Sequence, residues 1–112
     1  MKIASFNCRG LARLEKKLAL HRLILTSPVD VIFLQETLGP DDSITHLLEA
    51  MFPRWNFIGL DANGRSRGLT LGYINRTINL SSCWGGHGHI GVDLFSSDLG
   101  LKVRVINVYG PC

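Results

Sequence analysis

Two polar side chains stand where two apolar segments of the chain end, and both carry oxygen atoms of the kind that bind metal ions. Asn7 lies near the end of a short alternating segment, residues 2–8. Glu36 directly follows residues 29–35, a nearly unbroken run of β-branched and aromatic side chains. Amide and carboxylate oxygens are ligands for hard cations, so this pair suits Mg²⁺ or Mn²⁺ far better than zinc.

The segments around Asn7 and Glu36 predict a strand, a helix and a second strand. Residues 29–35 are apolar on both faces, which is typical of a strand covered on both sides in a layered α/β fold. The intervening residues 11–25 carry one stripe at helical spacing, formed by Leu11, Leu14, Leu18 and Leu25. Because this crossover brings the carboxyl ends of two parallel strands to one edge of a sheet, Asn7 and Glu36 are predicted to converge if the strands are neighbours.

Some of these residues also have an ordinary structural interpretation. Residues 35–37 could begin a solvated loop, in which case Glu36 has no special role. His21 falls inside the leucine stripe, and a histidine on an apolar helix face is more often packed than a ligand.

The remaining sequence predicts a second amphipathic helix and further strands. The helix spans residues 44–51, and the strands span residues 55–60, 69–74, 91–95 and 101–109. Residues 55–60 and 69–74 are expected to pair antiparallel, and residues 91–95 and 101–109 are expected to form a hairpin. Residues 81–89 are interpreted as a glycine-rich connector; Cys83, His87 and His89 match no closed zinc pattern.

Three other side chains are candidates for contact with a phosphate. Arg65 and Arg67 lie in a predicted loop, where they could bind phosphates or belong to an ordinary solvated turn. Tyr109 ends the last predicted strand, where its phenol could hydrogen-bond a phosphate or serve as a plain strand aromatic.

Length and composition predict one domain with one modest core, since the chain has 112 residues of which 46% are hydrophobic. The net charge of +3 is compatible with nucleic acid without requiring it. Three scattered cysteines favour a reducing compartment. No signal peptide or transmembrane run is evident, so an intracellular protein, nuclear or cytoplasmic, with no membrane partner is expected.

Four segments, in this order, resemble the endonuclease/exonuclease/phosphatase family. They are SFNCRGL (residues 5–11), VDVIFLQET (29–37), GRSRGL (64–69) and NVYGP (107–111). The closest likeness is to the endonuclease domain that opens the reverse-transcriptase polyprotein of plant non-LTR retrotransposons. The resemblance implies an α/β fold of two packed mixed sheets with helices outside, and cleavage of phosphodiester bonds with Mg²⁺. It also implies that Asn7 and Glu36 bind the metal and that Tyr109 lies against the scissile phosphate.

The sequence departs from the family where the later motifs should appear. An Asp-x-Asn group, a further Asp and a Ser-Asp-His segment should follow Tyr109, yet the chain ends three residues past it. Residues 61–63 spell Asp-x-Asn but precede Tyr109, so the role does not transfer. Residues 1–112 are therefore interpreted as a partial domain, the amino-terminal half of a two-sheet sandwich, truncated after the strand carrying Tyr109.

Truncation has consequences for the expected activity and association. The fragment is expected to bind Mg²⁺ or Mn²⁺ weakly. Because no general base is identified, the fragment is also expected to be inactive in isolation. An apolar sheet face is expected to stay uncovered, which predicts self-association. Three functions remain: a phosphodiesterase acting on DNA, a non-catalytic nucleic-acid-binding remnant, and a phosphatase of the same superfamily. The Arg65 and Arg67 loop and the basic balance favour DNA as the partner.

Overall fold

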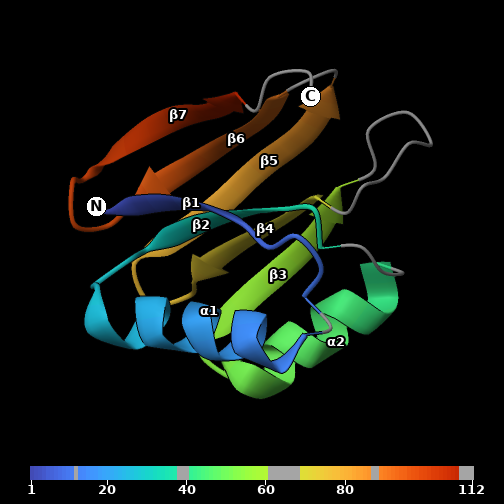
Figure 1. Ribbon diagram of the computed structural model, residues 1–112. Coiled ribbons are helices and arrows are strands. Elements are labelled where there is room, and N and C mark those ends of the chain that lie inside the picture. Colours follow the sequence, from blue (N-terminus) through green and yellow to red (C-terminus); the bar gives the residue numbers. More distant parts are fainter. Residues whose placement is uncertain (12, 38–40, 61–68, 87–88, 109–112) are drawn as a thin grey trace.

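The protein forms three layers, with two helices on one side of a first sheet and a second sheet on its other side (Figure 1). The computed structural model describes residues 1–11, 13–37, 41–60, 69–86 and 89–108. The elements in chain order are β1 (Ile3–Asn7), α1 (Leu14–Thr26), β2 (Val31–Gln35), α2 (Asp41–Met51), β3 (Trp55–Leu60), β4 (Leu69–Ile74), β5 (Ile78–Gly86), β6 (His89–Ser96) and β7 (Leu101–Val108).

The first sheet, sheet A, is mixed and has the strand order β1-β2-β4-β3. Strands β1 and β2 are parallel, as the crossover through α1 predicted, while β4 runs antiparallel to both β2 and β3. The second sheet, sheet B, is antiparallel with the order β5-β6-β7. The predicted α/β architecture with two sheets is confirmed.

Strand β2 lies at the centre of the molecule and is buried on both faces, as predicted. Val31 and Phe33 belong to the apolar cluster between the two sheets. Ile32 and Leu34 belong to the cluster between sheet A and the helices. Alternate side chains of one five-residue strand therefore tie all three layers together.

The interpretation of residues 81–89 as a connector was wrong, because most of this segment lies in strands. β5 continues to Gly86 and β6 begins at His89. The register against β6 shifts between Leu80 and Ser82, so the side chains that pack between the sheets change from even to odd positions. This bulge breaks the two-residue alternation by which a strand is recognised in a sequence. His87 lies outside the described residues.

The leucine stripe of α1 does not form the helix's core-facing side. Leu14, Leu18 and Leu25 are 70%, 57% and 68% exposed. The helix instead packs through Leu20, Leu23 and Ile24. It carries two apolar stripes, and helical spacing alone does not say which one faces the sheet.

Two smaller expectations about the helices can be compared with the structure. The His21 ring stacks on the ring of Phe52 with 5.7 Å between centroids, although the residue itself stays exposed. In the part of the chain that the structure describes, neither helix is both long and apolar enough to cross a membrane.

Candidate metal centre

The exits of β1 and β2 form one continuous edge of sheet A. Asn7 stands opposite Gln35 in the parallel register, so Glu36 follows directly beside the end of β1. Beyond the strands, the Cys8 N–H donates to the Gln35 carbonyl at 2.8 Å and the Gly10 N–H donates to the Glu36 carbonyl at 2.8 Å. The backbone thus brings Asn7 and Glu36 to the same edge, as the crossover predicted. Their metal-binding role stays a prediction.

Backbone strain is concentrated at this edge. Arg9 and Glu36 have φ angles of 47° and 54°, and they are the non-glycine residues of the described part that adopt positive φ. A left-handed conformation costs a non-glycine residue roughly 1–3 kcal/mol. The next residue, Thr37, is fully buried, and its Oγ1 has no hydrogen-bond partner among the residues that the structure describes. Costs of this kind are typical of functional sites.

The Asn7 side chain helps to shape the turn after β1. Its Oδ1 accepts a hydrogen bond from the Arg9 N–H at 3.0 Å. This local contact explains how Arg9 is held at positive φ, since an Asn side chain commonly closes such a turn. An amide oxygen has two lone pairs, so Oδ1 can hold the turn and still accept a second partner.

Cys8 lies between these residues but is not suited to metal binding. Burial raises the pKa of its thiol to about 12, against an opposing effect of the Lys16 charge, and the Glu36 charge raises it further. The thiol is therefore protonated at neutral pH and supplies no thiolate ligand. The effect of Glu36 on Cys8 also places the carboxylate within electrostatic reach of this buried side chain.

Gln35 joins the two sheets at this edge and was not singled out as a site residue by sequence reasoning. Its Nε2 donates to Asn107 Oδ1 on β7 at 2.7 Å and to Ser5 Oγ on β1 at 3.1 Å. The contact with Asn107 is partly buried and spans 72 positions of sequence. The only sequence signal was the position of Gln35 beside Glu36, which says nothing about a partner so distant.

The other predicted site residues cannot be placed in this geometry. Tyr109, Arg65 and Arg67 lie outside the described residues, so their roles stay predictions. Within the described ranges, no group of three or more His, Cys, Asp or Glu side chains gathers as a metal cluster would.

The donor set that remains is one carboxylate and one amide oxygen. Mg²⁺ is commonly held through one or two carboxylates while several of its coordination positions stay with water. Glu36 and Asn7 therefore fit a weakly held hard cation. They do not fit a closed structural metal site, which would need about four protein ligands.

Comparison with known proteins identifies both a family and a fold. The sequence matches the profile of the Endonuclease/Exonuclease/phosphatase family over residues 4–96. None of the curated proteins compared with the chain matches it.

Several solved structures share the fold. The human Nocturnin catalytic domain with bound sulfate anion aligns with a TM-score of 0.67 and 14% identity, over 90% of this chain and 46% of its own. An endonuclease/exonuclease/phosphatase from Bacteroides vulgatus aligns with a TM-score of 0.66 and 16% identity, over 92% of this chain and 49% of its own. AP endonuclease LMAP from Leishmania major aligns with a TM-score of 0.62 and 18% identity, over 94% of this chain and 38% of its own. The chain thus spans less than half the length of each of these structures.

The bridge between Gln35 and Asn107 predicts energetic coupling between the two sheets. In a double-mutant cycle of Gln35→Ala and Asn107→Ala, urea unfolding should give a coupling free energy of about 1 kcal/mol, the usual net worth of a hydrogen bond. The matched control is the exposed pair Asn56 and Asn75, whose side chains also hydrogen-bond each other. Coupling at Gln35 and Asn107 no larger than in this control would contradict the bridge.

Proposed function

The chain belongs to the endonuclease/exonuclease/phosphatase family, and we propose that it is a truncated Mg²⁺-dependent endonuclease-like domain derived from a phosphodiesterase that cleaves DNA. The observation that carries this proposal is the juxtaposition of Asn7 and Glu36 at the strained exit of β1 and β2. The finer origin we propose is the endonuclease domain of a plant non-LTR retrotransposon, of which this chain is the amino-terminal half.

Each predicted residue has a chemical task in this proposal. Glu36 and Asn7 would hold Mg²⁺. The ion would supply positive charge against a phosphate and its leaving oxygen. The Tyr109 phenol donates a hydrogen bond to that phosphate. Arg65 and Arg67 contact the phosphate backbone of DNA.

Two observations support DNA as the substrate. The chain is basic, with a net charge of +3 and a sequence pI near 9.0. One of the proteins that share its fold is an AP endonuclease from Leishmania major. At 18% identity this likeness concerns the fold, so the substrate is our inference and not a property transferred from that enzyme.

A non-catalytic nucleic-acid-binding remnant is the second candidate. It is favoured by the candidate site, where the described residues gather no group of three or more His, Cys, Asp or Glu side chains. The Ser-Asp-His segment, which is one of the later motifs expected from the family resemblance, does not occur in residues 1–112. In this case the arginine contacts persist while cleavage is lost.

Replacing Glu36 tests the metal site. Glu36→Gln removes the charge but keeps the shape of the side chain, so Mg²⁺ binding measured by calorimetry should weaken at least tenfold. The matched control is Glu49→Gln on α2, an exposed carboxylate that should leave binding unchanged. Equal Mg²⁺ affinity in the Glu36→Gln variant and the wild type would remove this strand end as the site.

Incubation of supercoiled plasmid with the purified chain and Mg²⁺ tests the catalytic state. We expect no nicking, because a positioned base that activates water contributes roughly 10²- to 10⁴-fold in rate and none is identified here. Salt-sensitive binding to a DNA duplex, followed by fluorescence anisotropy, should nevertheless be detectable. Nicking by the wild type and by Glu49→Ala, but not by Glu36→Ala, would show that residues 1–112 suffice for cleavage.

A further inference from the structure

A hollow with two arginines in its wall lies at the end of the molecule opposite the candidate metal centre, where β1 begins and β4 ends (Figure 1). Its volume is about 370 Å³, and it is lined by Arg54, Ile74, Asn75 and Arg76. Arg54 directly precedes β3, and the other three residues form the end of β4 and the turn after it. We call these four residues the arginine hollow. No carboxylate of the described residues lines it.

Hydrogen bonds fix the backbone on both sides of Arg76. Before it, the Asn75 N–H donates to the Arg54 carbonyl at 3.4 Å, which ties the two arginine-bearing turns together. After it, Thr77 Oγ1 donates to Asp30 Oδ1 at 3.0 Å. Arg76 therefore extends from a turn that is bonded both to the turn before β3 and to the residue before β2.

Arg54 also extends from an anchored backbone. Phe52 and Trp55, which stand on either side of it in the chain, are buried, and the Trp55 N–H donates to the Phe52 carbonyl at 3.0 Å. Both Arg54 and Arg76 are exposed, so their side chains are accessible to a ligand. A site whose backbone is fixed in advance loses less conformational entropy when it binds.

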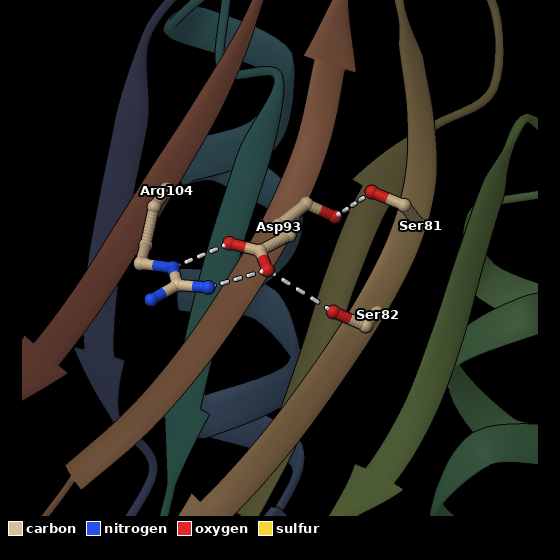
Figure 2. Close-up of polar contacts among 4 residues, drawn as sticks. All are labelled: Ser81, Ser82, Asp93 and Arg104. Carbon is tan, nitrogen blue, oxygen red and sulfur yellow. Dashed lines mark hydrogen bonds and ion pairs between the residues drawn. The ribbon is translucent and has the colours of Figure 1, made fainter.

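Arg54 and Arg76 have no ion-pair partner among the residues that the structure describes. Arg104 shows the contrasting case in Figure 2, because its Nε and Nη2 donate to the Asp93 carboxylate at 2.7 Å and 2.9 Å. Ser82 Oγ donates to the same carboxylate at 3.3 Å. Two uncompensated cations in one hollow repel each other and attract anions, so a bound anion would relieve the repulsion.

We propose that the arginine hollow binds the phosphate group of a small molecule. A guanidinium presents paired N–H donors that match two oxygens of a phosphate, and here two guanidiniums line one hollow. Ile74 adds an apolar wall on which the organic part of a phosphate monoester can pack. The volume lies at the small end of the range for ligand sites, roughly 300–1,000 Å³. This site goes beyond the proposed nuclease ancestry and does not depend on it.

The neighbouring hollow disfavours a nucleic-acid strand as the ligand. That hollow shares Arg76 with the arginine hollow, and its other charged side chains are Lys2, Asp30 and Asp98. Its side-chain charges therefore cancel, and successive phosphates of a strand crossing it would meet two carboxylates. A single phosphate held between Arg54 and Arg76 avoids that repulsion.

Titration of the wild-type chain with inorganic phosphate and with phenyl phosphate, followed in a two-dimensional NMR spectrum, tests the proposal. Sodium chloride at matched ionic strength is the reference. The backbone amide signals of Arg54, Asn75 and Arg76 should shift and saturate, while those of Cys8 and Gly10 at the metal centre should not. Phenyl phosphate should bind more tightly than inorganic phosphate, because its ring can pack on the apolar wall.

Substitutions then assign the binding to the two guanidiniums, with circular dichroism melting to verify folding. Arg54→Gln and Arg76→Gln should each weaken the affinity for phosphate about tenfold, since each removes charge-assisted hydrogen bonds. The matched control is Arg22→Gln on α1, an exposed arginine whose loss changes the net charge equally and should leave the affinity unchanged. Glu36→Gln should also leave it unchanged, which separates this site from the metal centre.

The proposal would be overturned if chloride reproduced the shifts, because they would then report ionic strength alone. Weakening by Arg22→Gln as large as by Arg76→Gln would indicate diffuse surface charge instead of a site. Loss of binding in Glu36→Gln would place the phosphate at the metal centre. Shifts of the Arg54 and Arg76 amides by a single-stranded oligonucleotide, but by neither small phosphate, would assign the hollow to nucleic acid. If a variant fails to fold, the wild-type titration decides, since absence of saturable shifts there contradicts the proposal.

Discussion

The burial of β2 on both faces is the constraint on which the rest of the structure depends. Val31 and Phe33 fill the space between the sheets, and Ile32 and Leu34 fill the space beneath the helices. A shift of one residue would exchange these two sets, and each would meet a core shaped for the other. The fixed register of β2 then determines which residues stand beside the end of β1, and therefore where Glu36 emerges.

Several residues at the exit of β2 adopt unfavourable conformations, and the burial of this strand holds them in place. Glu36 adopts positive φ, and Arg9 at the neighbouring exit is also left-handed. Thr37 buries a hydroxyl that has no partner within the described part of the chain. Such conformations persist where the surrounding structure over-determines them. The bridge from Gln35 to Asn107 adds to that determination, because it ties the end of β2 to β7 in the other sheet. In this member of the family, the exits of β1 and β2 thus form a platform for the candidate metal site, and the core and the other sheet hold that platform in place.

Local patterns in the sequence were enough to predict this platform but not everything around it. Apolar residues on both faces of the segment predicted β2. The crossover predicted the parallel pairing that places Asn7 beside Gln35. The bulge between Leu80 and Ser82 concealed β5 because it interrupts the alternation. The inward face of α1 could not be chosen from spacing, since tertiary packing selected between two apolar stripes. The contact of Gln35 with Asn107 is set by how the two sheets stack, which no local pattern contains.

The central claim is that the joint exit of β1 and β2 is the cation site of this domain, and paramagnetic broadening by Mn²⁺ in a two-dimensional NMR spectrum tests it most directly. The backbone amide signals of Cys8, Gly10 and Glu36 should broaden at the lowest Mn²⁺ concentrations. The opposite end of the sandwich offers an internal comparison, since Asp30 and Asp98 line a hollow there. Broadening that begins around these two carboxylates and spares the β1 and β2 exit would contradict the account.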